Sequence, residues 1–299
     1  MYVKPPVSHY QGTEKVGISD AFLPIFTHKL CGVDKCLNWD LMNQGLCTFS
    51  VIPIRREPSH KSEMVTQLLF GETWELLREE GDWLQVKIDS DGYEGWLDRA
   101  QSRFVKNALP PSETPWCTLD LVQSATSKDR HVLLVLGSVL PQFDGLNFKL
   151  QQEKFVFNGQ AVEAGKVVPA ASFAVKVANK FLGVPYLWGG KTPFGIDCSG
   201  LVQVVCKTAG VSLPRDASDQ ALVGETLDFV HQAVEGDLAF FENDEGRIVH
   251  VGMLCGPGRI LHASGSVRTD ALDTHGIFNS EKKKYTHKLR HIKRLNWNA

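Results

Sequence analysis

Residues 185–200, PYLWGGKTPFGIDCSG, are the stretch around which the chain is organised. Glycines and prolines crowd its first part, and an apolar run, LVQVVC at 201–206, follows directly. This order predicts a loop that leads into a helix. Cys198 then lies in the first turn of that helix, and Asp197 has a side chain suited to the N-cap position.

The predicted position of Cys198 bears on its chemistry. The first backbone N–H groups of a helix are unpaired, and the helix dipole places about half a positive charge there. This predicts a lowered pKa for the Cys198 thiol and a thiolate that acts as a nucleophile. The alternative is a buried cysteine that packs as a small apolar side chain. The residues around position 198 leave both interpretations open.

Two histidines downstream favour the interpretation of Cys198 as a nucleophile. Residues 247–254 and 258–264 are short apolar runs joined by a Gly-Pro-Gly turn at 256–258, so they predict two neighbouring strands. His250 and His262 lie about equally far from the turn and are expected to sit side by side. A thiol, a base and a group that orients the base form the set of side chains that nucleophilic acyl transfer requires.

The motifs of this region also occur in a characteristic order. They are YLWGG at 186–190, DCSGLV at 197–202, LPRDASDQ at 213–220, GDL at 236–238, HVG at 250–252 and HAS at 262–264. The set resembles the NlpC-type papain-like cysteine peptidases (the NlpC and p-sixty superfamily), which cut peptidoglycan peptides. The resemblance implies Cys198 as nucleophile, His250 as general base and His262 as the group that holds the ring of His250.

The upstream residues predict a small β-barrel. Short strand-like runs at 66–70, 73–77, 83–88 and 93–97 are separated by glycine-containing turns. This part resembles a bacterial SH3 (SH3b) domain, and its pairing with the peptidase motifs resembles the γ-D-glutamyl-L-diamino acid endopeptidases. The aromatic residues of the barrel are expected mainly in its core, with an exposed binding patch as the alternative; they are Trp74, Trp83, Tyr93 and Trp96.

The predicted domains follow from these patterns. Residues 1–41 are a poor match to everything after them, and Met42 is a candidate for the true start. The N-terminal segment 1–44 is therefore expected to be non-native or disordered, and a short lead strand or tail packed on the first barrel is the alternative. An SH3b domain is predicted at 45–106, a second, degenerate SH3b-like domain with a scaffolding role at 110–168, and the peptidase domain at 169–299. Helices precede strands in the last domain, which predicts an α+β fold.

The resemblance assigns further site residues. Tyr186 is expected to donate its hydroxyl to the oxyanion together with the Cys198 backbone N–H. Asp197 is expected to hold the amine of an N-terminal L-Ala, and Ser199 to line the site.

Two more substrate contacts are expected by resemblance. Glu94, on the SH3b domain, is the candidate for contacting the free amine of the substrate. The family often has serine where Ala217 stands, so Ser218 beside it is the candidate for that polar contact.

Together these features predict a cysteine endopeptidase that hydrolyses the γ-D-glutamyl–diamino acid bond of stem peptides with a free N-terminal L-Ala. Because an unpaired buried carboxylate is costly, peptides still attached to glycan should be refused. The alternatives are an N-acetylmuramoyl-L-alanine amidase or acyltransferase on the same fold, or a non-enzymatic wall-binding SH3b protein.

The amino-acid composition limits the binding partners and the cellular compartment that can be expected of the protein. The chain of 299 residues has 32 basic and 34 acidic side chains, so nothing suggests nucleic acid as a partner. Its seven cysteines lack the paired spacing of a zinc site, which predicts reduced thiols and no metal or other cofactor. No signal-peptide pattern or run of about 18 apolar residues occurs. This favours recycling of wall peptides in the cytoplasm without a membrane partner; a different true N-terminus would allow the periplasm or cell envelope.

Overall fold

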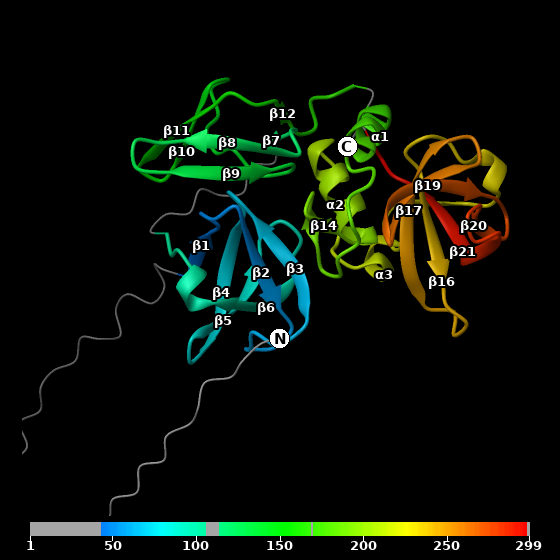
Figure 1. The fold of residues 1–299 in the computed structure, drawn as a ribbon, viewed down its shortest axis with the longest axis horizontal. Helices are drawn as coiled ribbons and strands as arrows, with labels where there is room; N and C mark the ends of the chain where they lie inside the picture. The colour runs from blue at the N-terminus through cyan, green and yellow to red at the C-terminus, as the bar shows by residue number, and fades with distance from the viewer. Residues whose placement is uncertain (1–42, 106–113, 169, 298–299) are drawn as a thin grey trace, which may run out of the picture. The chain divides into compact units, whose positions relative to one another are not determined.

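The computed structural model describes residues 43–105, 114–168 and 170–297. The hypothesis that Met42 is the true start, and almost all of the predicted segment 1–44, lie outside these residues. The described chain forms two β-rich regions followed by a region of helices and strands (Figure 1). No helix of the described residues is long and apolar enough to cross a bilayer.

The first region is a six-stranded antiparallel sheet that curls into a small barrel (Figure 1). Alternate residues of one strand, Leu84, Val86 and Ile88, are fully buried, as the two-residue period of a strand requires. Trp74 and Trp96 are buried, which confirms the core interpretation for these two aromatic residues. The strands are β1 (Gln44–Leu46), β2 (Val51–Arg55), β3 (Met64–Leu69), β4 (Thr73–Glu80), β5 (Trp83–Ile88) and β6 (Glu94–Asp98).

The second region is also all-β. Its six short strands form a four-stranded sheet and a separate two-stranded sheet. Phe148 and Phe155 stack in its core with ring centroids 4.9 Å apart. The likeness of this region to an SH3b domain stays a prediction. The strands are β7 (Trp116–Thr118), β8 (Val122–Thr126), β9 (His131–Val135), β10 (Asn147–Leu150), β11 (Glu153–Phe157) and β12 (Ala161–Glu163).

The third region has the predicted α+β order. A glycine in the left-handed conformation follows each of the helices α1 (Ala170–Lys180) and α2 (Cys198–Thr208) within two or three residues, Gly183 and Gly210. A short helix, α3 (Ala217–Gln220), follows. Two short strands, β13 (Lys191–Thr192) and β14 (Gly195–Ile196), form a hairpin in the loop before α2.

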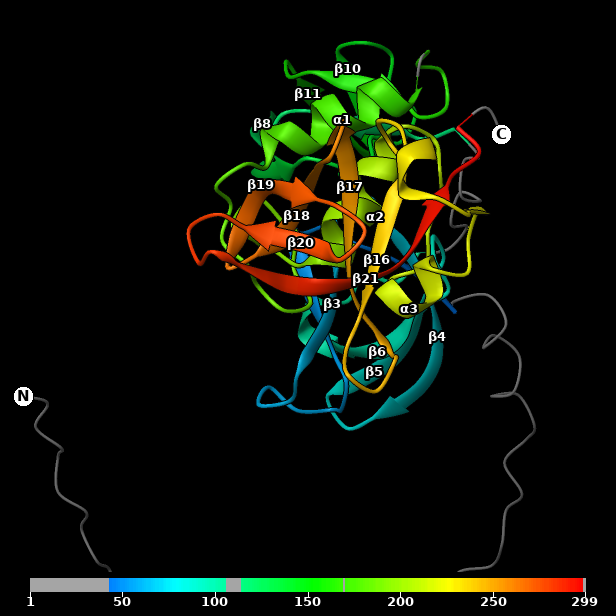
Figure 2. The same cartoon turned by 90° about the vertical axis from the view of Figure 1, so that its right-hand side faces the viewer.

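The remaining strands form one antiparallel sheet in the order β15-β21-β16-β17-β18-β19-β20. Because β21 also pairs with β20, strands β16 to β21 close on themselves (Figure 2). Strand β21 is much longer than the predicted strand at 292–295, since its many charged and partly exposed residues hide the alternation. The strands are β15 (Glu225–Leu227), β16 (Leu238–Glu242), β17 (Ile248–Gly256), β18 (Arg259–Ser264), β19 (Ser266–Leu272), β20 (Gly276–Asn279) and β21 (Lys284–Arg294).

The main apolar core lies between the helices and this sheet. Val202, Val205 and Cys206 of α2 pack in one cluster with Val251 of β17 and Leu261 of β18. Figure 1 shows α1 and α2 beside β17. This packing brings the first turn of α2 against the strand that carries His250.

Candidate active site

Cys198 is the first residue of α2, as predicted. Asp197 caps the helix, because its Oδ1 accepts the backbone N–H of Gly200 at 2.7 Å. The thiol is buried, with 7% of the residue exposed, and the backbone N–H groups of Val251 and Ser199 contact the sulfur. The nucleophile candidate therefore lies beside the residue that follows His250 in β17.

The predicted ionisation of Cys198 is wrong for the site without substrate. Burial raises the pKa of its thiol to about 11, and the negative charge of Asp197 adds to this. The contacts with the backbone N–H groups of Val251 and Ser199, and the charge of Arg215, lower the pKa but do not outweigh burial. The thiol is therefore protonated at neutral pH, and a base must remove its proton before the sulfur attacks.

The raised pKa predicts how Cys198 reacts with iodoacetamide. Only the thiolate reacts, so the rate should rise about tenfold per pH unit between about pH 7 and about pH 9.5. Peptide mapping of quenched samples measures this rate at Cys198, and a small thiol of known pKa corrects for the reagent. A rate that is already constant from about pH 6 would instead show a thiolate–imidazolium pair at rest.

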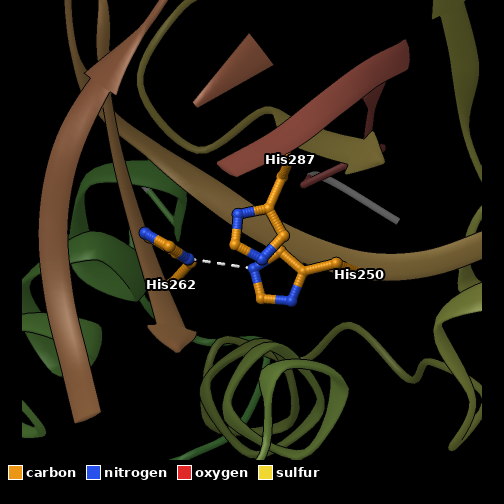
Figure 3. A group of neighbouring side chains, drawn as sticks. All are labelled: His250, His262 and His287. Carbon is orange, nitrogen blue, oxygen red and sulfur yellow. Dashed lines mark hydrogen bonds between the residues drawn. The ribbon is translucent and has the colours of Figure 1, made fainter. Parts of the chain in front are cut away.

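His250 and His262 are neighbours, although not as the turn predicted. His262 pairs with Gly252, because each lies five residues from Pro257, whereas His250 lies seven residues from it. A bulge between Leu254 and Gly256 interrupts the register only next to the turn. The two histidines are thus diagonal neighbours on one face of the sheet. His250 Nε2 lies 2.9 Å from His262 Nδ1 (Figure 3). A Cβ at Gly252 would lie 2.9 Å from the His262 Cβ, so glycine is needed between them.

The environment of His250 suits a neutral base. Burial lowers its pKa well below the usual value, and the neighbouring histidines His287 and His262 lower it further. In Figure 3 the second ring nitrogen of His250, Nδ1, points away from His262, on the side of the helix drawn below. That helix is α2, which packs on β17.

A carboxylate that the sequence prediction missed lies behind His262. The Oδ2 atom of Asp270, on β19, is 3.1 Å from His262 Nε2. Arg268 donates to both carboxylate oxygens of Asp270, at 2.9 Å and 3.1 Å. Burial acts to raise the pKa of Asp270, but the hydrogen bonds from Arg268 and His262 outweigh it and lower the pKa. No motif marks Asp270; only the pairing of β18 with β19 brings it to His262.

A third histidine, also missed, lies over the first. The His287 ring stacks on His250 with centroids 4.1 Å apart and an interplanar angle of 24° (Figure 3). Among the described residues, His250, His262 and His287 are the group whose ring nitrogens could hold a metal ion, since one nitrogen of each lies within 4.8 Å of the others. Because His250 Nε2 already bonds His262, a metal would have to replace that hydrogen bond.

Asp197 is paired inside the protein, and its expected contact with a substrate amine stays a prediction. Both of its oxygens are paired with Arg215, at 2.5 Å and 3.1 Å, and they also accept the backbone N–H groups of Gly189 and Gly200. Arg215 is buried and donates as well to Ser199 Oγ at 2.8 Å. The carboxylate is therefore occupied inside the protein, and the geometry does not favour it as the partner of a substrate amine.

Tyr186 lies close to the nucleophile. It is partly exposed, and burial raises the pKa of its phenol to about 12, with the Cys198 and Asp197 charges adding to this. The phenol is thus a neutral donor at neutral pH, as an oxyanion contact requires. Ser199 is buried beside Asp197 and Arg215, so it supports the loop.

The structure does not bring Glu94 or Ser218 into this group. Glu94 is exposed at the start of β6 and pairs with Lys87 of β5, while Ser218 is exposed on α3. The neighbour of Glu94, Tyr93, contacts the third region instead. Its hydroxyl donates to Asp216 Oδ2 at 3.4 Å. Strand alternation turns Glu94 away from the side that Tyr93 occupies.

Comparisons with known proteins agree with this arrangement. Residues 183–290 match the NlpC/P60 family, and residues 54–101 match the bacterial dipeptidyl-peptidase Sh3 domain. A Bacillus subtilis protein named "Gamma-D-glutamyl-L-lysine dipeptidyl-peptidase" is 33% identical over 73% of this chain and 74% of its own length. A Bacillus cereus protein of the same name is 27% identical, with 73% of each chain covered.

Among solved structures, an NlpC/P60 family protein from Bacillus cereus has the same fold. The superposition gives a TM-score of 0.71 at 21% identity, and it covers 84% of this chain and 99% of the other. The match extends over most of the chain, so the likeness in fold is not confined to residues 183–290.

Proposed function

The chain belongs to the NlpC/P60 family, and from this we propose that it is a cysteine endopeptidase acting on peptidoglycan stem peptides. It hydrolyses the bond between γ-D-glutamate and the diamino acid when the N-terminal L-Ala is free. The observation that carries the proposal is the hydrogen-bonded pair of His250 and His262, with His250 on the strand whose residue Val251 contacts the sulfur of Cys198. It occurs in a chain 33% identical to a protein named "Gamma-D-glutamyl-L-lysine dipeptidyl-peptidase".

The reaction begins from a neutral thiol and a neutral imidazole. His250 Nδ1 takes the proton of Cys198, and the sulfur attacks the γ-carbonyl carbon of D-glutamate. The oxyanion accepts hydrogen bonds from the Cys198 backbone N–H and the Tyr186 hydroxyl. The imidazolium of His250 then protonates the leaving amine of the diamino acid. Water, deprotonated by His250, hydrolyses the thioester and frees L-Ala-γ-D-Glu.

The free amine of the substrate needs a carboxylate, and Asp216 takes the place expected of Asp197. Asp216 is solvent-accessible, and Arg215 next to it is committed to Asp197. The Tyr93 hydroxyl from the first barrel lies 3.4 Å from Asp216 and can share the ammonium group. Partial burial raises the pKa of Asp216, against the charge of Arg215, and a bound ammonium group would lower it.

Removing the charge of Asp216 tests this assignment. Asp216→Asn should lower kcat/KM for L-Ala-γ-D-Glu-diamino acid peptides about 10- to 100-fold, as the loss of a hydrogen bond to a charged group predicts. The N-acetylated peptide should be a poor substrate of wild type and variant alike. Asp219→Asn, at an exposed position of α3 just after Asp216, is the matched control and should leave the rate nearly unchanged. Equal cleavage of free and acetylated peptides by the wild type would contradict the free-amine requirement.

Product analysis tests the bond that is cut. Mass spectrometry of digests should show L-Ala-γ-D-Glu and the free diamino acid, with meso-diaminopimelate and L-lysine peptides compared side by side. Cleavage between muramic acid and L-Ala in a glycan-bound peptide would favour the amidase alternative. An enzyme that requires the free amine of L-Ala acts on peptides that have already been released from glycan, because the glycan is attached at that amine.

A further inference from the structure

The hydrogen bonds behind His262 form a continuous chain across three neighbouring strands. His250 on β17, His262 on β18 and Asp270 on β19 share one face of the sheet. His262 lies opposite Gly252 of β17 and Arg268 of β19. Each hydrogen bond therefore joins His262 to a residue of the neighbouring strand that is two positions from the one directly opposite. The distances are 2.9 Å from His250 to His262 and 3.1 Å from His262 to Asp270.

The donor and the acceptor are fixed in the last hydrogen bond of this series, between His262 and Asp270. An ionised carboxylate only accepts hydrogen bonds, so His262 Nε2 must carry the proton that faces Asp270. Arg268 donates to both oxygens of Asp270 and keeps the carboxylate in the orientation that His262 needs. Asp270 is 7% exposed and His262 is 1% exposed, so water does not compete readily for these bonds.

The proton positions of the two rings follow from that hydrogen bond. A neutral imidazole carries one N–H, so with its proton on Nε2, His262 presents a lone pair at Nδ1. The Nε2 of His250 must then donate to it at 2.9 Å. His250 is left with a lone pair at Nδ1, the nitrogen that points away from His262 in Figure 3. That nitrogen is the one that can take the proton of Cys198.

We propose that Asp270 is a positioning residue that, through His262, holds His250 in the tautomer whose Nδ1 is free to accept the thiol proton. The inference rests on the proposed function, because it gives Asp270 a part in preparing the general base. It also gives a role to the contacts of Arg268 with Asp270, beside its ion pair with Glu281. Without the carboxylate, His262 could carry its proton on either nitrogen, and His250 could present an N–H to the sulfur.

The experiment compares wild type, Asp270→Asn and the control Asp273→Asn. Asp273 lies in the turn after β19 and bonds Tyr285 at the protein surface, away from the chain of bonds. Long-range ¹⁵N–¹H spectra of histidine-labelled protein report the tautomer of each ring, and steady-state kinetics report kcat and KM. Circular dichroism confirms that each variant is folded.

Wild type and Asp273→Asn should show His250 and His262 with their protons on Nε2. In Asp270→Asn, His250 should show a measurable population with the proton on Nδ1. The kcat should then fall roughly 10- to 100-fold with little change in KM, because part of the contribution of a positioned base is lost. A wild type with His262 protonated on Nδ1 would overturn the proposal, whatever the variants do. So would a fall in kcat with unchanged tautomers, or changed tautomers with unchanged kcat. If no peptide is cleaved even by wild type, the proposed function fails, while the spectra still decide the tautomers.

Discussion

Replacing Cys198 by alanine should lower kcat on the order of 10⁴-fold or more, because every covalent step needs its sulfur. No other thiol in the described part of the chain can replace it. Cys47, Cys117 and Cys206 are buried, and Cys255 is partly buried near the opposite end of β17 from His250. Release of the diamino acid, followed by mass spectrometry, measures the loss.

Cys255→Ala is the matched control for that experiment. It removes a partly exposed thiol from the same strand as His250 without touching the hydrogen bonds of the site. This variant should cleave the peptide at nearly the wild-type rate. Substantial cleavage by folded Cys198→Ala would mean that the nucleophile is another group.

Replacing Arg215 by methionine should destabilise the protein by about 3–5 kcal/mol, the cost of breaking a buried ion pair by removing one partner. Arg215 is 2% exposed and donates to Asp197, Ser199 and Thr66. The variant leaves the Asp197 carboxylate buried without its charged partner, next to the nucleophile. Urea unfolding, followed by fluorescence, gives the change in the free energy of unfolding.

Two further variants distinguish the loss of the buried ion pair from the effect of exchanging an arginine side chain for methionine. Arg247→Met removes an exposed arginine whose ion pair with Glu245 is expected to contribute at most about 1 kcal/mol. Asp197→Asn combined with Arg215→Met removes the buried charge and should recover part of the lost stability. A loss below about 1 kcal/mol for Arg215→Met would show that the buried pair contributes little.

The local features of the site could be predicted from the sequence. Glycines, prolines and an apolar run marked the loop before α2 and placed Cys198 in its first turn. The glycine-bounded runs around His250 and His262 marked the two strands. These features depend on residues near one another in the chain, so short-range patterns are enough to find them.

The features that depend on packing could not be predicted. The pKa of Cys198 is raised by burial under β17 and β18, which the helix terminus alone does not reveal. The contact of His250 with His262 is diagonal because His262 lies opposite Gly252, and Asp270 enters through the register of a third strand. Nothing in the sequence shows that Arg215 pairs with both oxygens of Asp197.

Labelling with a chloromethyl ketone built on L-Ala-γ-D-Glu, followed by peptide mapping, tests directly whether Cys198 is the nucleophile. We expect one label per chain, on the sulfur of Cys198, with activity lost in proportion to labelling. Inactivation with the label on another residue, or full activity with Cys198 completely labelled, would contradict that role.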